Sequence, residues 1–308
     1  MDTKNTKPSV AILMSTYNGE KFLDKQLESI AGQTYTNNHL IVRDDGSKDS
    51  SRKIIEKWKK YICIIEFPTS INLGPAQSFM ELARNSGQYD YYAFSDQDDV
   101  WDKEKIEVAI NKLNDISTPA LYFSRSRYID ANGVLLSEDQ LLNLEYMTVE
   151  SEIVCGYCPG CAMVFNKALM NEVRQQRYRA IPMHDMVFIM TALAIGTVVY
   201  DVFPRFSRRM HTGNVVGREG KNRFQKLQQS YRRWIKDSKN YPLDKFVEDF
   251  IENTKNKNPQ YDMNEMRVFA DYKKSLISKM KIYKSNKFIT ESKQGNRSFK
   301  IRLILGLL

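Results

Sequence analysis

Short apolar runs alternate with helix-like patterns four times in the first 118 residues. The runs, which we predict to be strands, cover residues 10–15, 39–43, 61–67 and 91–95. Between them, apolar side chains recur at helical spacing, as at Leu23, Leu27 and Ile30. This regular alternation predicts an α/β fold, in which a mostly parallel sheet is flanked by helices.

Acidic side chains follow two of the four predicted strands. Asp44 and Asp45 end the second strand, and Asp96, Asp98 and Asp99 follow the fourth. Because the carboxyl ends of parallel strands lie at one edge of a sheet, we expect both clusters to converge on one crevice. Carboxylates two residues apart, such as Asp96 and Asp98, suit a divalent cation that also binds phosphate oxygens.

The sequence lacks the glycine-rich loops that bind phosphates in many nucleotide-binding proteins. Neither G-x-G-x-x-G nor G-x-x-x-x-G-K-[ST] occurs. A nucleotide at the acidic edge would therefore need a metal ion to hold its diphosphate. The alternative for residues 96–99 is a solvated acidic turn that caps a helix starting near Asp102, because aspartate is common before helices.

The alternation changes after residue 119. There the sequence predicts a hairpin turn at 130–133, a polar loop over 138–152 and a helix opened by Pro182. Three more strands are predicted, at 121–129, 161–165 and 197–202. The basic segment that follows, 205–214, is rich in groups that bind anions.

The chain carries a net charge of +9, which is unevenly placed. Residues from about 220 onward are helical, lysine-rich and aromatic. An apolar stripe flanked by lysine and arginine consists of Phe224, Leu227, Tyr231, Trp234 and Ile235. This stripe either packs on a core or lies on an anionic membrane surface, and we favour the membrane. Nucleic-acid binding ranks lower, because the tail has no recognised module.

The cysteines indicate a reducing compartment rather than a disulfide framework. Cys155, Cys158 and Cys161 form a C-x-x-C-x-x-C run. No fourth cysteine or histidine lies close by to complete a zinc or iron–sulfur site, so we expect reduced thiols. We also expect neither a signal peptide nor a membrane-spanning helix.

Four motifs, taken in order, resemble the inverting glycosyltransferases of family 2, which have the GT-A (Rossmann-like) fold. The motifs are residues 10–18, Asp44-Asp45-Gly46-Ser47, Asn72-Leu73-Gly74 and Asp96-Gln97-Asp98-Asp99. Three further stretches look like bacterial rhamnosyltransferases that use dTDP-L-rhamnose to build cell-surface polysaccharides. They are Ser95 to Trp101, His184-Asp185 and Arg209 to Gly217. The resemblance covers roughly the first 215 residues.

The resemblance implies a substrate-binding role for each matching residue. Thr16, Tyr17 and Asn18 would line the base and ribose pocket. Either Asp44 or Asp45 would hydrogen-bond the base. Further substrate-binding residues would be Glu20, Asn72, Asp96, Gln97, Gly160, His184 and Arg209.

The resemblance also implies a metal centre and a general base. Asp98 would ligate Mg²⁺ or Mn²⁺, with Asp96 between the ribose and the metal and His211 near the metal or the diphosphate. The cation would act as a Lewis acid on the leaving group. Asp185 would deprotonate the acceptor hydroxyl, which attacks the anomeric carbon and inverts it.

Several of these roles have a purely structural alternative. Asp185 has the position of an ordinary helix cap, and His211 that of a surface histidine. Arg208 and Arg209 are, on this alternative, solvated charges. Tyr17 either packs or stacks on a base.

The predicted function is that of a metal-dependent inverting transferase, which moves L-rhamnose from dTDP-β-L-rhamnose to a polyprenol-linked saccharide. A UDP-hexose donor is the alternative within the enzyme class. A non-catalytic, membrane-docked scaffold is the alternative outside it.

The predicted catalytic domain is 1–218, with a nucleotide-sugar half to about 118 and an acceptor half from about 119. A basic helical extension over 219–308 follows it and would dock on an anionic membrane. We expect the protein in the cytoplasm, peripheral on the inner face of the cell membrane. A homo-oligomer is left open.

Overall fold

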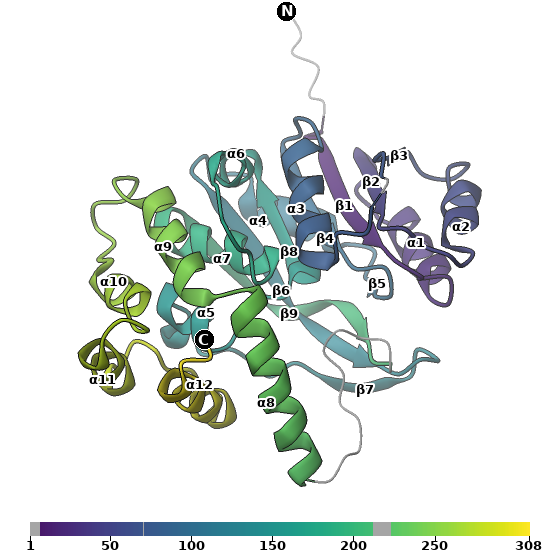
Figure 1. Cartoon of the computed structure of the whole chain (residues 1–308). Coiled ribbons are helices and arrows are strands. Elements are labelled where there is room, and N and C mark those ends of the chain that lie inside the picture. The colour runs from purple at the N-terminus through teal and green to yellow at the C-terminus, as the bar shows by residue number, and fades with distance from the viewer. Residues whose placement is uncertain (1–6, 70, 212–222) are drawn as a thin grey trace, which may run out of the picture. The chain divides into compact units, whose positions relative to one another are not determined.

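The computed structural model describes residues 7–69, 71–211 and 223–308, which form two compact units (Figure 1). Unit 1 consists of Met1–Leu141, Cys158–Arg174 and Gly196–Val215. Unit 2 consists of Leu142–Tyr157, Gln175–Ile195 and Val216–Leu308. The predicted domain boundary at 218 lies outside the described residues and stays a prediction.

The N-terminal part of unit 1 has the predicted alternation of strands and helices. Its elements are β1 (Val10–Thr16), α1 (Leu23–Ala31), β2 (Asn38–Asp44), α2 (Ser51–Trp58), β3 (Ile64–Glu66), α3 (Pro75–Asn85) and β4 (Tyr91–Ser95). The four strands are parallel, in the order β3-β2-β1-β4. Thr16 on β1 is in register with Asp44 on β2, and Met14 with Ser95 on β4, so the carboxyl ends share one edge.

The rest of unit 1 extends this sheet with mixed pairing. The elements are β5 (Val100–Trp101), α4 (Lys105–Leu113), β6 (Ala120–Ile129), β7 (Leu135–Glu138), the 3-10 turn η2 (Gly160–Ala162), β8 (Met163–Asn166), α6 (Lys167–Gln175) and β9 (Thr197–Arg209). The sheet runs β3-β2-β1-β4-β8-β6-β9-β5, with β7 paired to β6. Strand β8 is antiparallel to β4 and β6, whereas β6 and β9 are parallel.

Strand β9 is longer than the sequence predicted. The prediction ended it at residue 202, but the strand continues through the basic segment to Arg209 because it pairs with β6 along its length. The C-terminal part of β9 also pairs with β5. These two strands are antiparallel, and Val100 lies opposite Ser207. The pairing brings the end of β9 to the acidic stretch that precedes β5.

Unit 2 is helical. Its elements are the 3-10 turn η1 (Leu144–Tyr146), α5 (Val149–Val154), α7 (His184–Ile195), α8 (Arg223–Asn240), α9 (Leu243–Thr254), α10 (Asn264–Ala270), α11 (Leu276–Lys284) and α12 (Lys293–Leu305). The predicted loop over 138–152 is wrong where α5 begins. Thr148 caps this helix by accepting from the backbone N–H of Ser151 at 3.1 Å. Helix α7 is apolar nearly all round, which fits its burial.

The C-terminal helices of unit 2 confirm the predicted helical extension. They pack around aromatic rings, among them Phe269, Phe288 and Phe299, whose ring centroids lie 5.5, 5.9 and 6.4 Å apart in pairs. Side chains of residues 223–229 are not described, so Phe224 and Leu227 of the predicted stripe lie outside the described side chains. Within the described ranges, none of the helices has both the length and the apolar character needed to span a bilayer.

Candidate active site

The acidic stretch at residues 96–99 forms the connection between β4 and β5. Because β5 pairs with β9, this connection lies against the end of β9. There Nε2 of His211 is 2.8 Å from Oδ2 of Asp98. The His211 ring also packs on Phe22, with ring centroids 4.7 Å apart. His211 is therefore no ordinary surface histidine, and the structure brings together two of the three predicted metal ligands.

The side chain of Arg209 holds the acidic stretch in place by binding the main chain of that stretch. The buried guanidinium donates from Nε to the carbonyl of Asp98 at 3.0 Å. It also donates to the carbonyls of Asp130 and Ala131 at 3.1 and 3.2 Å. The alternative that Arg209 is a solvated charge is therefore wrong. Its contact with substrate stays a prediction.

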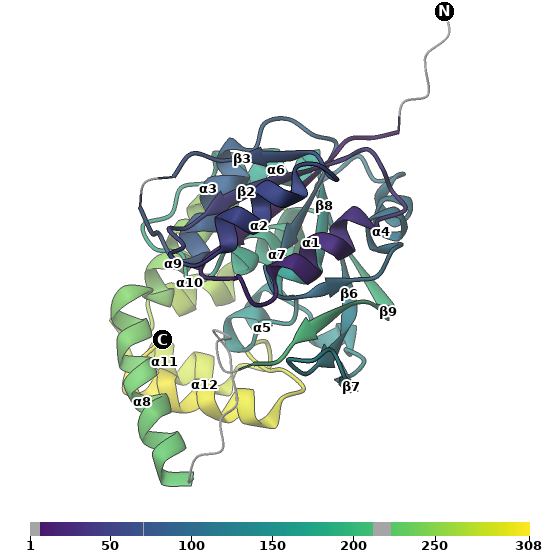
Figure 2. The ribbon, with the colours of Figure 1, turned by 90° about the vertical axis from the view of Figure 1, so that its right-hand side faces the viewer.

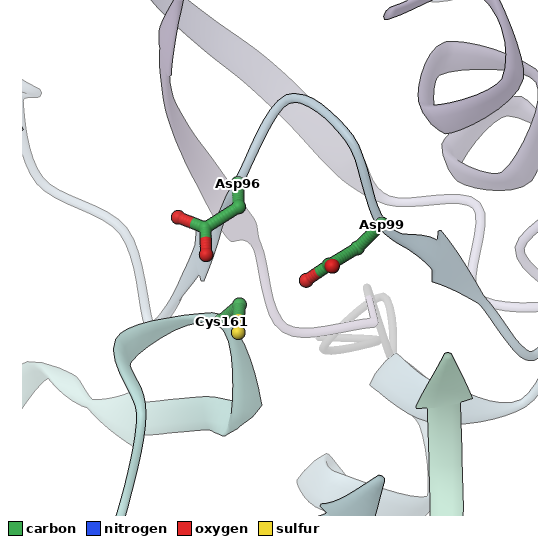
Figure 3. A group of neighbouring side chains, drawn as sticks. All are labelled: Asp96, Asp99 and Cys161. Carbon is green, nitrogen blue, oxygen red and sulfur yellow. The ribbon is translucent and has the colours of Figure 1, made fainter. Parts of the chain in front are cut away.

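Asp99 lies inside the protein beside Asp96 and Cys161 (Figure 3). One ligand atom from each of the three residues lies within 4.8 Å of the others. Oδ2 of Asp99 has no hydrogen-bond partner among the described residues. Asp99 is not the cap of a helix, because β5 follows it and α4 begins only at Lys105.

Burial favours the neutral forms of two groups of this cluster. Burial, followed by the charges of Asp96 and Asp98, raises the pKa of Asp99 to about 8. Burial also raises the pKa of the Cys161 thiol well above its usual value. A thiol is in any case a poor ligand for Mg²⁺ or Mn²⁺, because these cations prefer oxygen to sulfur.

The pair formed by Asp98 and His211 is the better donor set for a divalent cation. It offers a carboxylate oxygen and an imidazole nitrogen. Mn²⁺ can bind both atoms, whereas Mg²⁺ prefers the oxygen. Both side chains are partly exposed, so a bound cation would keep positions open for other oxygens. The residues present therefore fit the predicted cation, with Asp98 and His211 as ligands, whereas Asp96 is grouped with Asp99 and Cys161.

A buried lysine beneath the acidic stretch was missed from the sequence. Lys105 is fully buried, and its Nζ donates to the carbonyl of Cys161 at 2.6 Å. The Nζ atom also lies 3.6 Å from the centroid of the Trp101 ring. Burial lowers the pKa of Lys105 to about 8, although nearby acidic groups oppose the shift. The helical spacing of Lys105 with Ala109 and Leu113, which are buried on the same helix, was the signal that could have revealed it.

Gln97 ties the acidic stretch to the loop after β1. It accepts from the backbone N–H of Tyr17 at 2.9 Å and donates to the Tyr17 carbonyl at 3.1 Å. A Cβ atom on Gly19 would lie 2.3 Å from Oε1 of Gln97, so only glycine fits there without displacing this amide. Tyr17 is 47% exposed, which leaves part of its ring accessible to a base.

The other predicted residues of this loop are bound to the loop after β2. The side chain of Asn18 accepts from the N–H of Lys48, and that of Glu20 from the N–H of Ser50, both at 2.9 Å. Thr16 donates to Asp44 at 3.3 Å. These side chains shape the edge of the sheet, and their contacts with a substrate stay predictions.

Asp45 connects the end of β2 to the third sequence motif. Its carboxylate accepts from the N–H groups of Leu73 and Gly74 at 2.9 and 2.8 Å and pairs with buried Arg43. Asn72 donates from its amide to the Asp45 carbonyl at 2.8 Å. Asp44 is bound by Arg52 and Ser47. Both carboxylates are thus engaged, and which of them contacts a base remains open.

We expect Asp45→Ala to lower the free energy of unfolding by about 3–5 kcal/mol, because it leaves the charge of Arg43 buried without its partner. Urea denaturation followed by circular dichroism measures this loss. Glu28→Ala is the matched control, since its ion pair with Lys25 is exposed and should contribute about 1 kcal/mol or less. Equal losses in the two variants would contradict the role of Asp45.

Unit 2 contains the predicted base. His184 and Asp185 open α7, whereas all the other predicted residues, including buried Gly160 at the start of η2, belong to unit 1. Oδ1 of Asp185 accepts from the N–H of Met186 at 2.8 Å. Burial lowers the pKa of His184 to about 4, so its ring is neutral at pH 7.

Glu152 is a buried neighbour of Asp185 that the sequence analysis missed. Both of its carboxylate oxygens lie 3.3 Å from the N–H of Tyr157. Burial raises the pKa of Glu152 to about 8, and the charge of Asp185 adds to this rise. A helix inside a predicted loop hid this residue, because no periodic pattern pointed to α5.

The raised pKa of Glu152 predicts a pH-dependent stability. Between its ordinary value of 4.5 and about 8, this carboxyl is ionised in the unfolded chain but protonated in the folded one. Stability should therefore fall as the pH rises through this window, by at most about 1.4 kcal/mol per pH unit from this group. Glu152→Gln should remove that part of the decline, as measured by urea denaturation from pH 5 to 8.

Glu252→Gln provides the control for this pH series. Its side chain is exposed in the same unit and pairs only with Lys255 among the described ion pairs. The Glu252→Gln curve should run parallel to that of the wild type. A Glu152→Gln curve that also ran parallel to the wild type would contradict the buried, protonated carboxyl.

The cysteines are free thiols, as predicted. Cys155 is exposed, whereas Cys158 and Cys161 are buried. Among the described residues, the only group of three or more possible ligands with metal-ligand spacing contains Cys161 with Asp96 and Asp99, and neither Cys155 nor Cys158.

Comparison of the sequence with known proteins finds glycosyltransferases. The sequence model of Glycosyl transferase family 2 matches residues 11–173. The chain is 29% identical to the dTDP-rhamnosyl transferase RfbG of Shigella flexneri over 221 residues, which are 66% of this chain and 73% of RfbG. It is 32% identical over 121 residues to the UDP-Glc:alpha-D-GlcNAc-diphosphoundecaprenol beta-1,3-glucosyltransferase WfaP of Escherichia coli, covering 39% of this chain and 45% of WfaP.

A solved structure resembles the whole chain. The mannosyltransferase PcManGT from Pyrobaculum calidifontis, in complex with GDP-Man and Mn²⁺, superposes with a TM-score of 0.55. The superposition covers 98% of this chain and 75% of PcManGT, at 12% sequence identity. At this identity the likeness is one of fold.

Proposed function

Because the chain belongs to glycosyl transferase family 2, we propose that it transfers L-rhamnose from dTDP-β-L-rhamnose to a saccharide acceptor. The chain is a glycosyltransferase with the GT-A fold. Its similarity to RfbG over two thirds of the sequence supports the rhamnosyl donor. Membership of an enzyme family sets aside the non-catalytic scaffold.

The pair of Asp98 and His211 is the observation that carries the proposal. It lies at the carboxyl edge of the sheet, where α/β folds bind ligands, and it joins two segments that are far apart in the sequence. A divalent cation bound there would act as a Lewis acid on the donor diphosphate. PcManGT, which has the same fold, was solved with Mn²⁺ and supports this choice of cation.

The chain's own residues around this pair have distinct tasks. Arg209 fixes the main chain of the acidic stretch, and Gln97 fixes the loop that presents Tyr17. The exposed ring of Tyr17 is available to stack on the thymine base. These contacts pre-form the donor site, which lowers the ordering cost of binding.

Asp185 is the proposed general base. Its carboxylate would accept the proton of the acceptor hydroxyl as that oxygen attacks the anomeric carbon of rhamnose. The bond from the anomeric carbon to the diphosphate breaks on the opposite face, and dTDP leaves with the bonding electrons. One displacement of this kind inverts the anomeric configuration and needs no covalent intermediate on the protein.

The proposed acceptor is a polyprenol-linked saccharide in cell-surface polysaccharide synthesis. WfaP, whose name specifies a diphosphoundecaprenol-linked acceptor, supports this class. We propose that the reaction takes place at the cytoplasmic face of the membrane, where such an acceptor would be anchored. The same relative uses a UDP-linked sugar, which keeps a UDP-hexose as the second candidate donor.

A donor panel tests the proposed function. The protein with Mn²⁺ or Mg²⁺ would be tested for binding and slow hydrolysis of dTDP-rhamnose, UDP-glucose, UDP-GlcNAc and UDP-galactose. We expect dTDP-rhamnose to bind most tightly and to be the sugar nucleotide that is hydrolysed. Preference for one of the UDP-sugars would overturn the rhamnosyl assignment and favour the second candidate.

A further inference from the structure

Helix α11 in unit 2 exposes an apolar face to solvent. Leu276, Ile277 and Met280 are 79%, 70% and 54% exposed, although leucine, isoleucine and methionine are usually buried. Together with Lys281 and Lys284, they line one surface pocket. These five residues are called the α11 face.

The α11 face is not needed to hold the helix in place. Ile282, on another side of α11, is buried and anchors the helix to the unit. Lys279 reaches across to α12 and donates to the carbonyl of Ile304 at 3.4 Å. Both views show α11 beside α12 (Figures 1 and 2). The face is therefore an outward surface on a helix that is already packed.

The apolar surface continues onto the neighbouring end of α12. Ile304 and Leu305, which follow the contact with Lys279, are 61% and 51% exposed. Exposed apolar patches that are bordered by polar residues commonly mark an interaction site.

The charge around the α11 face is strongly positive. Residues 273–308 contain ten lysines and arginines but only one acidic residue, Glu291. This segment alone accounts for the net charge of +9, so the remaining chain is balanced. A partner of the α11 face must therefore offer both an apolar interior and negative charge.

We infer that the α11 face binds an anionic lipid bilayer. Leu276, Ile277 and Met280 enter the boundary between headgroups and acyl chains, while Lys281 and Lys284 contact anionic headgroups. A second copy of the chain fits less well, because it would bring two strongly basic segments together. This inference goes beyond donor and acceptor chemistry, and it moves the docking surface from the predicted stripe on α8 to α11.

Vesicle co-sedimentation tests this inference. The full chain should bind vesicles of phosphatidylcholine mixed with phosphatidylglycerol, and it should bind vesicles of phosphatidylcholine alone much more weakly. The combined variant Leu276→Ser, Ile277→Ser and Met280→Ser should weaken binding at least about tenfold, because the apolar insertion is lost. Its circular dichroism and its hydrolysis of donor in solution should match the wild type.

A matched control comes from the other unit. Val134, Leu135 and Leu136, at and beside β7, are 59%, 58% and 58% exposed. Their combined replacement by serine removes similar apolar surface and should leave vesicle binding unchanged. Because donor hydrolysis is measured separately, failure of the docking surface can be told apart from failure of the proposed enzymatic function.

The lysines give a second, independent variant. Lys281→Gln with Lys284→Gln should weaken binding to the anionic vesicles about 25-fold, or about fivefold per charge. The inference is overturned if the serine variant binds like the wild type. It is also overturned if the wild type does not co-sediment with the anionic vesicles. A dimer that the serine variant abolishes, as seen by analytical ultracentrifugation, would then assign the face to a second copy of the chain.

Discussion

Asp98→Asn is expected to lower kcat for sugar transfer about 10³-fold, because a bound cation supplies several kcal/mol of stabilisation to the leaving diphosphate. Asparagine is nearly the same size, so the acidic stretch keeps its shape, but it lacks the charge that a divalent cation requires. The same substitution leaves His211 without its carboxylate partner. Steady-state transfer from dTDP-rhamnose in the presence of Mn²⁺ measures the effect.

Glu104→Gln is the matched control for this substitution. Glu104 is an exposed carboxylate that lies just before α4 and makes no side-chain cap to it. Its loss should leave kcat within about twofold, since an exposed surface charge contributes little. Full turnover by Asp98→Asn, or an equal loss in both variants, would rule out Asp98 as the ligand that catalysis needs.

Asp185→Asn should lower transfer by about 10²–10⁴-fold while donor binding is kept, because only the proton acceptor is removed. Calorimetric titration with dTDP-rhamnose measures donor binding, and an acceptor assay measures transfer. The amide of asparagine can still accept from the N–H of Met186, as the carboxylate does. A residue that only caps α7 would therefore tolerate this change.

The two readouts separate the possible roles of Asp185. Loss of transfer with intact donor binding supports the base. Unchanged transfer would reduce Asp185 to a helix cap, and loss of donor binding together with transfer would indicate a structural role. Glu152→Gln in the same assay serves as a reference, because it replaces a neighbouring carboxyl that burial keeps protonated.

The sequence predicted well those features that arise from local periodicity. The parallel direction of the first four strands and the shared edge of the two acidic clusters follow from the alternation itself. Strand β4 was predicted with the bounds that the structure shows, because the continuous apolar run from Tyr91 to Phe94 lies between polar segments. The helical C-terminal extension also followed from composition and spacing.

Features that depend on contacts between distant segments could not be predicted. Strand β5 has two residues and exists only because β9 pairs with it. The same pairing buries Arg209, whose charge suggested a surface position. No local pattern could show that a guanidinium would bind the main-chain carbonyls of residues far away in the chain.

The same distinction between local patterns and distant contacts applies to the site residues. The motifs identified Asp98 and His211, which the structure places in contact. The motifs could not reveal that the carboxylate of Asp45 would accept hydrogen bonds from backbone N–H groups. Nor could they reveal that Asp99 and Lys105 would both be buried close enough to interact. Burial decides the charge state of such groups, and burial is a property of the whole sheet.

The dependence of donor binding on metal is the most direct test of the proposed site. Binding of dTDP-rhamnose would be titrated calorimetrically with and without Mn²⁺, for the wild type and for Asp98→Asn. Mn²⁺ should tighten donor binding to the wild type and should have little effect on the variant. A metal–diphosphate site at Asp98 would be contradicted if Mn²⁺ raised the donor affinity of both proteins equally. It would also be contradicted if Mn²⁺ left the donor affinity of the wild type unchanged.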